Sequence, residues 1–451
     1  MIHGGDRLGQ RRTARAGAML LCGVMGVGSR TAEGAESSAP MPGSFRNPAA
    51  VDEVRRGERT VANAAWWGFD PVDATEAIQS AIDSRAAKVI VPYVGAEWVV
   101  RPVTLASNQE LVLDPGVVVL AKRGEFHGMR DSLFTGTGVE NVTVRGYGAV
   151  LRMWQEDYVS GAYEQSEFRH TLAFRGSGKI AVLGLTLEHS GGDGIYLGPI
   201  EDERRLGCRD VLIRDYVCRN NYRQGMSLLS GEQVRIEHCV FRNTRGTAPQ
   251  AGLDLEPGSA RDALIDIAVL NCISEDNEGS AFVVNVMRLT PDSQPVDVRF
   301  WNCLGRNTRH PGLRVMVGEE RVPRGRIEFV ACTIERTEYS GLYCAWNPSG
   351  DLQLRFSDCK WNMVARKRTE FPLQVKFVAR EDRSGLGRIE FVRSYLYDDR
   401  ERSALQFSGR MEHSFAEGIS GELYVVNPRS SITTQDPFLQ KTHLQVHVHG
   451  P

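Results

Sequence analysis

Two kinds of short apolar segment alternate along the chain from Lys179 onward. The longer kind alternates apolar and polar residues, as in IAVLGLTLEHS, VLIRDYVCRNN and VRIEHCVFRNT, and the shorter kind opens with glycine, as in GIYLG, GMSLL and GLDLE. A period of two residues is typical of β-strands, and the pair recurs about every 25 to 33 residues. Because neither strand can bury its apolar face alone, the pattern predicts stacked parallel β-coils, with equivalent residues about 4.8 Å apart.

One position of this repeat is occupied by cysteine in five successive units. The five lie in the similar phrases IEHCVF, VLNCIS, FWNCLG, VACTIE and FSDCKW, and their separations are 33, 31, 29 and 27 residues: Cys239, Cys272, Cys303, Cys332 and Cys359. Nine cysteines in one chain would ordinarily suggest a disulfide framework. The regular spacing instead predicts free thiols that stack in successive coils as small core residues.

The short glycine-led strands can be aligned by their leading glycines. The first and third residues after that glycine are apolar in every unit, so they are expected to point inward. The residue between them is expected to point outward, and it forms one column: Tyr196, Ser227, Asp254, Val283, Arg314 and Tyr343. A second outward column follows two residues later: Gly198, Leu229, Glu256, Asn285, Met316 and Ala345. The outward face therefore carries the candidate chemistry.

Asp254 and Glu256 share this outward face at positions i and i+2. Their spacing along a strand is about 6.5 to 7 Å, which lies within the range of about 6.5 to 9.5 Å that separates the acid and the base of inverting glycosidases. The small neighbours Ser227 and Gly198 predict an open groove beside them. The alternative is a solvated strand face with two ordinary acidic residues.

Asp193 stands between glycines in GGDGIYLG, two coils before Asp254. It is therefore expected about 10 Å along the coil axis from Asp254, on the same edge as Gln224. Arg223 and Gln224 are placed to reach either neighbouring coil, and an arginine close to Asp193 would keep its carboxylate ionised. Asp193 is therefore a candidate third carboxylate, and the alternative is a turn residue before a tight glycine corner.

An earlier segment, residues 151–170, mixes aromatic and charged residues in a way that does not suit a buried strand. We expect a long loop folded over the coils, because loops on rigid solenoids commonly carry binding groups. Aromatic rings with charged neighbours suit a sugar ring and its hydroxyls. The candidate substrate-binding residues are Asp157, Tyr158, Glu167, Arg169, Tyr196, Arg223, Gln224, Asn285 and Arg314. His170 is a candidate acid or base, or a structural histidine.

Composition and charge narrow the function classes. The chain has 451 residues and a formal net charge of -2, so no nucleic-acid or anionic-membrane partner is expected. No Cys-x-x-Cys pair, His-Glu-x-x-His, P-loop or Gly-x-Ser-x-Gly motif occurs in a fitting context, which leaves metalloprotease, NTPase and serine hydrolase readings without support. After the N-terminal region no apolar segment is long enough to insert in a membrane.

The N-terminus carries the features of an export signal. Arg11, Arg12 and Arg15 precede the apolar run AGAMLLCGVMGVG, which is too short to cross a bilayer. We expect a signal peptide over residues 1–35, a linker over residues 36–58 and export to the periplasm or the extracellular space. The paired arginines leave the twin-arginine route open.

The segment WWGFDPVDATEAIQSAIDSRAAKVIVP (Trp66 to Pro92), followed by SNQELVLDPGVVVLA (Ser107 to Ala121), resembles the opening of right-handed parallel β-helix proteins of the pectate lyase and polygalacturonase superfamily. The resemblance covers about residues 60 to 420. It implies an all-β right-handed parallel β-helix over residues 59–425, with a short N-terminal helix from TEAIQSAID capping the first coil and a C-terminal tail over residues 426–451. That fold hosts hydrolases, lyases, epimerases and binding proteins alike.

The resemblance also bears on the site. GGDGIYLG keeps the first aspartate of the Asp-Gly-Ile-Asp motif of polygalacturonase-like enzymes as Asp193, but Tyr196 stands where the second aspartate would be. The run from YEQSEFRH through GGDGIYLG to RNTRGTAPQAGLDLEPG resembles an exported bacterial family of β-helix proteins described as polysaccharide-active. This similarity implies one common site and a polysaccharide partner, without naming the sugar.

Three functions remain open at this point. The first is a glycoside hydrolase without a cofactor, in which Asp254 and Glu256 are the acid and base and Asp193 is a third carboxylate. The second is a polysaccharide lyase or uronate epimerase, in which Arg223, Arg314 or His170 is the base and an acidic cluster could hold Ca²⁺. The third is a non-catalytic carbohydrate-binding solenoid. A monomer and a trimer are both compatible with the sequence.

Overall fold

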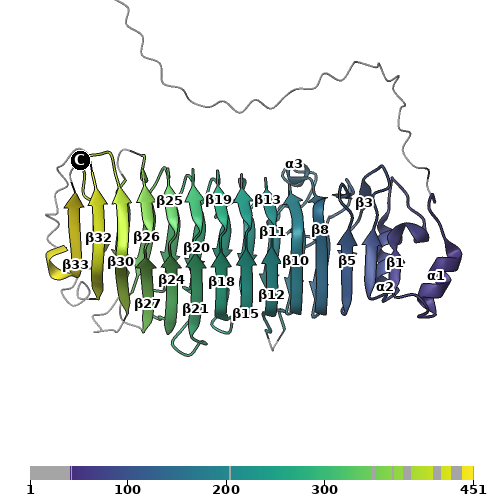
Figure 1. Cartoon of the computed structure of the whole chain (residues 1–451), viewed down its shortest axis with the longest axis horizontal. Helices are drawn as coiled ribbons and strands as arrows, with labels where there is room; N and C mark the ends of the chain where they lie inside the picture. Colours follow the sequence, from purple (N-terminus) through teal and green to yellow (C-terminus); the bar gives the residue numbers. More distant parts are fainter. Residues whose placement is uncertain are drawn as a thin grey trace, which may run out of the picture. The chain divides into compact units, whose positions relative to one another are not determined.

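Parallel strands stack coil upon coil along the chain (Figure 1). The computed structural model describes residues 41, 43–202, 205–347, 351–367, 370–378, 387–409, 418–427 and 439–449. The expected signal peptide and the first part of the expected linker lie outside the described residues. All strand pairings between the coils are parallel, so the predicted all-β right-handed parallel β-helix is confirmed.

The described strands form two parallel sheets. The smaller sheet has 11 strands: β4 (Val103–Thr104), β7 (Phe134–Thr137), β9 (Leu172–Arg175), β11 (Asp193–Gly198), β14 (Gln224–Leu228), β17 (Leu253–Leu255), β20 (Phe282–Asn285), β23 (Leu313–Met316), β26 (Leu342–Trp346), β29 (Leu373–Phe377) and β31 (Leu405–Gly409).

The larger sheet has 22 described strands, and most coils contribute two of them: β1 (Val61–Asn63), β2 (Lys88–Val91), β3 (Trp98–Val100), β5 (Gln109–Leu113), β6 (Val118–Ala121), β8 (Glu140–Arg152), β10 (Gly178–Glu188), β12 (Cys208–Arg214), β13 (Val217–Arg219), β15 (Gly231–Glu237), β16 (Val240–Arg242), β18 (Leu264–Leu270), β19 (Ile273–Glu275), β21 (Val296–Trp301), β22 (Leu304–Arg306), β24 (Gly325–Val330), β25 (Thr333–Glu335), β27 (Leu352–Ser357), β28 (Lys360–Asn362), β30 (Arg388–Tyr397), β32 (Ile419–Val426) and β33 (His443–His449).

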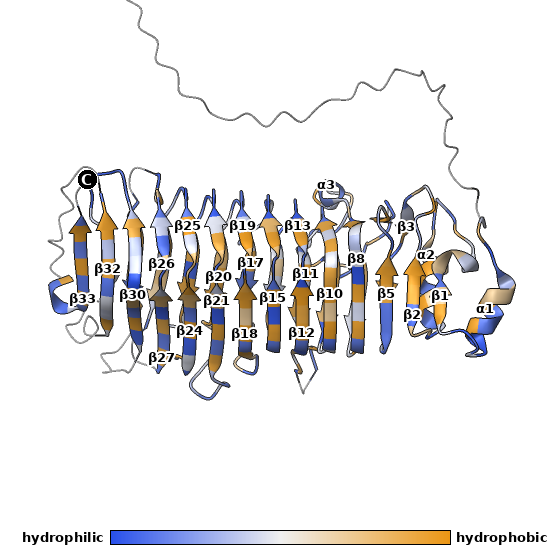
Figure 2. Cartoon of the chain, in the orientation of Figure 1, coloured by the Kyte–Doolittle hydropathy of each residue, from blue (hydrophilic) through white to orange (hydrophobic). Residues whose placement is uncertain are grey.

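The register of the smaller sheet matches the columns expected from the glycine alignment. Tyr196 pairs with Ser227, and Ser227 pairs with Asp254. The column continues through Val283, Arg314 and Tyr343. Asn285 pairs with Met316, as the second column requires. Alternation along the strands is visible as bands of apolar and polar residues (Figure 2).

The core runs through the middle of the coils and includes the cysteine column. Cys239, Cys272, Cys303, Cys332 and Cys359 are buried and free. Their thiols donate to backbone carbonyl oxygens, for example from Cys239 Sγ to Glu237 O at 3.1 Å. The predicted stack of unpaired core thiols is therefore confirmed.

Helices are confined to a few short segments of the described chain. They are α1 (Pro48–Arg55), η1 (Ala64–Trp67), α2 (Thr75–Asp83), α3 (Gln155–Tyr158) and η2 (Leu439–Lys441). α2 is the expected capping helix, with Ile78 and Ile82 fully buried. No helix in the described ranges is long and apolar enough to cross a membrane.

The two ends differ from the expected boundaries. α1 lies inside the segment 36–58 that we expected to be a linker, and it buries Ala50, Val51 and Val54. At the other end, β33 lies inside the expected tail 426–451 and pairs along its whole length with β32. A single short helix or strand has too few apolar residues for its pattern to be recognised, so the sequence alone did not predict that the fold includes these two segments.

Candidate active site

The candidate site forms where β11, β14 and β17 begin. Gly194 and Gly225 follow the site residues Asp193 and Gln224 within β11 and β14, where neighbouring coils approach closely. A Cβ atom on Gly194 would lie 2.6 Å from Gly225 O, and one on Gly225 would lie 2.3 Å from Gly252 O. Only glycine fits such close stacking. The repeated glycine thus lets successive coils bring their polar side chains together.

Asp193 is fully buried, with 0% of its surface exposed. Its backbone N–H donates to His170 Nδ1 at 3.0 Å, and Arg223 Nη1 lies 3.7 Å from Asp193 Oδ1. Neither carboxylate oxygen accepts a well-formed hydrogen bond from the described residues. Burial raises the pKa of Asp193 to about 7, although the Arg223 charge opposes this shift. Near neutral pH the Asp193 side chain therefore exists in comparable amounts as the neutral acid and as the carboxylate.

Asp254 is also buried, with 1% exposed, and it lies on the strand after Ser227. Gln224 Nε2 donates to Asp254 Oδ2 at 2.6 Å, while Oδ1 has no hydrogen-bond partner among the described residues. Burial, and then the nearby Glu256 charge, raise the pKa of Asp254 to about 7. Two aspartates in one cluster therefore hold protons far above the ordinary aspartate range.

Arg223 lies among four carboxylates. Its guanidinium is 3.2 Å from Glu256, 3.6 Å from Glu167 and 3.7 Å from Asp193, and its charge also favours the ionised form of Asp254. Asn285 Nδ2 donates to Glu256 Oε1 at 2.9 Å. Glu256 and Glu167 are 34% and 36% exposed, whereas Arg223 is only 15% exposed. The cluster therefore opens to solvent on the side of the two glutamates.

A ring stack borders the cluster. The His170 and Tyr196 rings lie 4.7 Å apart at 16°, and the Arg175 guanidinium lies 4.9 Å from the centre of the Tyr196 ring. Burial, together with the charges of Arg175 and Arg223, lowers the pKa of His170 well below its ordinary value. His170 is therefore neutral at physiological pH, and its Nδ1 accepts the Asp193 N–H. Burial raises the pKa of Tyr196 to about 12.

The expectation of an open groove was wrong. Ser227, Asp193 and Asp254 are all buried, because the loop that precedes β9 covers this part of the smaller sheet. Arg169 forms an antiparallel bridge with Gly191, and a Cβ atom on Gly192 would lie 2.7 Å from Glu167 O. The strand pattern shows which side chains leave the core, but it does not show what covers them.

Three residues expected to contact substrate instead hold this loop in place. Arg169 is fully buried, and its guanidinium donates to the carbonyls of Phe126, His127 and Glu164. The Tyr158 ring is buried and contacts the Arg169 guanidinium at 5.6 Å. Asp157 pairs with Arg123 at 3.1 Å. These positions correct the expectation for Asp157, Tyr158 and Arg169, since their polar groups face the protein.

Most of the other candidates are brought together. Glu167, His170, Tyr196, Arg223, Gln224 and Asn285 join Asp193, Asp254 and Glu256 in the cluster. Arg314 does not, because it lies two coils beyond Asp254 in the same column, after Val283. The sequence reasoning did not select Arg175, whose guanidinium lies over the Tyr196 ring. Extending the second outward column by one coil before Gly198 would have reached it, because Arg175 pairs with Gly198.

A metal centre is not evident in the described ranges, where no group of three or more His, Cys, Asp or Glu residues is arranged to hold a metal ion. The chemistry that the cluster offers is proton transfer by the two raised aspartates, charge stabilisation by Arg223, and hydrogen bonding by Gln224 and Asn285.

Comparisons with known proteins match the fold only. No family model and no curated protein matches the sequence. Among solved structures, the A-module of a mannuronan C-5 epimerase from Azotobacter vinelandii is 14% identical with a TM-score of 0.59, over 86% of this chain and 96% of that chain. An E. coli bacteriophage tailspike protein solved with a pentasaccharide is 13% identical with a TM-score of 0.55, over 87% and 70%.

A Yersinia enterocolitica family 28 exopolygalacturonase is 12% identical with a TM-score of 0.51, over 86% of this chain and 78% of that chain. At these identities the likeness establishes architecture and leaves the reaction open. Taken with the stacked parallel coils and the buried core column, it shows that the chain has the right-handed parallel β-helix fold.

Proposed function

We propose that this protein is a carbohydrate-active enzyme, and specifically a glycoside hydrolase that cleaves a polysaccharide reaching the cluster from the side of Glu167 and Glu256, where the cluster is open to solvent. The observation that carries the proposal is the cluster of Asp193 and Asp254, each buried with a pKa raised to about 7 beside Arg223. Perturbed carboxyl groups packed around one cation are typical of catalytic sites. The named neighbours, an epimerase, a tailspike bound to a pentasaccharide and an exopolygalacturonase, support a carbohydrate ligand.

In this proposal Asp254, in β17, and Glu256, directly after it, have different roles. Asp254 retains its proton up to about pH 7 and donates it to the glycosidic oxygen as the bond breaks. Glu256, partly exposed and held by Arg223 and Asn285, accepts a proton from the attacking water. Their strand positions i and i+2 give a spacing of about 6.5 to 7 Å, which suits an inverting reaction.

The remaining cluster residues orient these groups. Gln224 bonds to Asp254 Oδ2 and so leaves Oδ1 to deliver the proton. The positive charge of Arg223 stabilises the carboxylates of Glu256 and Asp254 when they are ionised. Glu167 and Glu256 form the exposed side, so the sugar approaches there. Asp193 is the third carboxylate and adjusts the charge around Arg223.

A second candidate, a polysaccharide lyase or uronate epimerase, is favoured by the ring stack. A neutral His170, Tyr196 and Arg175 lie together, and proton removal from C5 of a uronate needs a base and a nearby cation for the substrate carboxylate. A non-catalytic binding solenoid would be favoured by arginines paired to both acids. Glu256 does pair with Arg223, but Asp254 bonds to Gln224.

The deciding experiment is a polysaccharide screen with three readouts. Purified protein is incubated with neutral glycans and polyuronates, with and without chelator. New reducing ends without ultraviolet absorbance support hydrolysis. Absorbance of an unsaturated uronate supports a lyase, and deuterium incorporation at C5 without cleavage supports an epimerase. Glycan binding with none of these products would support the binding solenoid and contradict the enzyme proposal.

The hydrolase proposal also predicts the shape of the pH profile. Because Asp254 acts as a protonated acid with a pKa of about 7, kcat/KM should fall about tenfold per pH unit above that value. The profile is measured with the substrate from the screen at constant ionic strength. A rate that instead rises through pH 7 would assign the raised group a base role and favour the lyase or epimerase.

We also propose export, since a polysaccharide substrate would lie outside the cytoplasm and Arg11, Arg12 and the apolar run after them form the expected signal. Cell fractionation of the full chain, with an Arg11→Lys/Arg12→Lys variant to probe the twin-arginine route, tests this. Light scattering of the purified protein separates the monomer from the trimer.

A further inference from the structure

A polar corner runs along the coil axis on the side where the larger sheet turns toward the smaller one. One residue per coil sits there with a left-handed backbone, at φ values between 52° and 58°: His189, Asn220, Asn243, Asp276, Asn307 and Arg336. Asparagine and aspartate tolerate this conformation best among non-glycine residues. Five steps of about 4.8 Å make the corner roughly 24 Å long.

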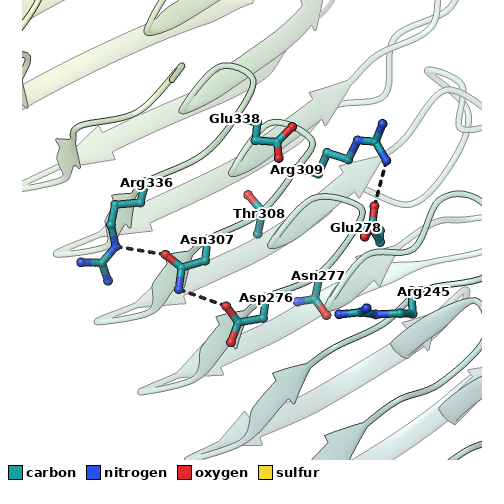
Figure 3. A pocket seen from close by; sticks show the side chains of 9 residues that line it. All are labelled: Arg245, Asp276, Asn277, Glu278, Asn307, Thr308, Arg309, Arg336 and Glu338. Atoms are coloured by element: carbon teal, nitrogen blue, oxygen red, sulfur yellow. Dashed lines mark hydrogen bonds and ion pairs between the residues drawn. The ribbon is translucent and has the colours of Figure 1, made fainter. Parts of the chain in front are cut away.

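Side chains of neighbouring coils bond to each other along this corner (Figure 3). Asn307 Nδ2 donates to Asp276 Oδ1 at 3.0 Å, and Arg336 Nε donates to Asn307 Oδ1 at 3.0 Å. Beside this row, Arg309 Nη1 donates to Glu278 Oε2 at 3.0 Å. The row is therefore ordered before any ligand arrives, which lowers the entropy lost on binding.

A cavity of about 520 Å³ lies on the corner. Buried Asn277 and Thr308 lie among the exposed ends of charged side chains that complete its lining: Arg245, Asp276, Glu278, Asn307, Arg309, Arg336 and Glu338. The Arg245 guanidinium and the Glu338 carboxylate form no hydrogen bond or ion pair with the described residues. A donor and an acceptor thus remain unused at the cavity.

The charges of the lining indicate the class of ligand. Three arginines face one aspartate and two glutamates, so the formal charges cancel. A polyanion gains nothing net from such a surface, whereas hydroxyl groups need donors and acceptors side by side. No aromatic residue lines this cavity, so hydrogen bonding must supply the recognition.

A second cavity continues the same line. It measures about 320 Å³ and includes Trp154, Gln155 and His189. Gln155 Nε2 donates to Arg245 O at 2.6 Å, which links the two cavities directly. Their alignment along the axis suits an extended chain more than a single compact molecule.

We propose that the corner between Trp154 and Glu338 is an accessory binding site for a neutral, hydroxyl-rich glycan chain. It shares no lining residue with the Asp193 and Asp254 cluster, and it rests on the proposed function only in taking a glycan as the ligand. The accessory site holds the chain on the coil surface while the cluster acts on another part of it.

The test is affinity electrophoresis of the full chain in gels that contain a neutral glucan, galactomannan or xylan, or a polyuronate as the charged control. We expect at least one neutral glycan to retard the protein. The double variant Glu278→Ala/Arg309→Ala should weaken that retardation about tenfold. The matched control Asp358→Ala/Arg393→Ala removes a comparable but somewhat more exposed ion pair of 2.8 Å outside both cavities and should leave the retardation unchanged.

Asn307→Ala provides a second, milder variant, and circular dichroism checks the fold of each. Retardation that survives both the double variant and Asn307→Ala, or that occurs only with the polyuronate at low salt, would overturn the proposal, as would no retardation by any neutral glycan. An Asp254→Asn variant should be retarded like the wild type. If the screen finds no product while retardation persists and needs Glu278 and Arg309, the enzyme proposal fails and the accessory site stands.

Discussion

Glu188 and Asp193 lie on the same coil and both have almost no exposed surface, although Asp193 lies deeper in the protein, and their pKa values move in opposite directions. Glu188 sits in register between Arg152 and Arg219, and each arginine donates to one of its oxygens at 2.5 Å. Burial alone would raise the pKa of Glu188, but these two hydrogen bonds outweigh it and lower the pKa. For Asp193, burial wins and the pKa rises to about 7.

The difference lies in the neighbouring coils. In a parallel stack each side chain has one neighbour above and one below, so opposite charges in register cancel each other. Glu188 has two such neighbours, whereas Asp193 pairs in register with the neutral Gln224. Burial therefore does not decide the protonation state by itself: Asp193 has no opposite charge in register, and Arg223 offsets its burial only in part.

The largest expected effect is on kcat, which should fall when Asp254 is substituted but not when Glu188 is. Asp254→Asn removes the proposed acid without changing side-chain size, so kcat should fall by about 10² to 10⁴-fold. Glu188→Gln should leave kcat of the folded protein within about twofold, because Glu188 does not touch the cluster. Steady-state kinetics on the substrate from the screen measure both. Full activity in Asp254→Asn, and also in Glu256→Gln, would refute the assignment of the acid and base.

The next effect concerns stability at Asp193. Its folded pKa of about 7 exceeds the ordinary value of 3.8, so the native protein loses stability as the pH rises from about 4 to about 7 and then levels off. Asp193→Asn removes the buried charge, and for a pKa raised from 3.8 to about 7 this relief is worth about 4 kcal/mol at pH 8. The buried amide without partners offsets about 2 kcal/mol of this, so the net gain in stability at pH 8 should be about 2 kcal/mol. At pH 4 the charge relief is almost gone while the amide cost remains, so the variant should be about 2 kcal/mol less stable than the wild type. Melting temperatures at both pH values decide this, and a loss of stability at pH 8 would contradict the raised pKa.

Glu188→Gln should destabilise the fold at neutral pH, and this change in stability should be somewhat smaller than the gain expected for Asp193→Asn at pH 8. Its lowered pKa contributes stability above the ordinary glutamate pKa, and this contribution is lost as the pH falls through the folded value. At pH 7 we expect a loss of about 1.5 kcal/mol, near the lower bound for hydrogen bonds to charged groups, because both arginines are about one third exposed. Denaturation at pH 7 and pH 4 tests it, and an equal loss at both would show that packing rather than charge is responsible.

These contrasts also show what the sequence could and could not predict. The two-residue period and the leading glycines of the short strands predicted the register of the smaller sheet, so Ser227, Asp254 and Asn285 were assigned to the correct columns. Burial of those columns was not predictable, because the covering loop before β9 is irregular and carries no period. Arg169 reads as a free surface cation in sequence, but three backbone carbonyls hold it inside the loop.

The sequence also could not predict which charged side chains pair with one another. Nothing in the sequence distinguishes the two arginines that neutralise Glu188 from Arg223, which is shared among several acids. That distinction depends on which coil lies above and below, and insertions such as residues 245–250 change the spacing locally. The sequence therefore located the cluster, whereas the raised pKa of its aspartates needed the register and the cover together.

The smallest expected effect is at Tyr196, and it separates the two enzyme proposals most sharply. In a hydrolase Tyr196 only supports the ring of His170, so Tyr196→Phe keeps the stack and should change kcat by less than about threefold. In a lyase or epimerase the phenol would exchange a proton with the substrate, and its loss should cost about 10² to 10⁴-fold. His170→Gln tests the same stack from the other side, since it also removes the acceptor of the Asp193 N–H. A large effect of Tyr196→Phe with near-normal activity in Asp254→Asn would move the catalytic centre from the aspartates to the ring stack.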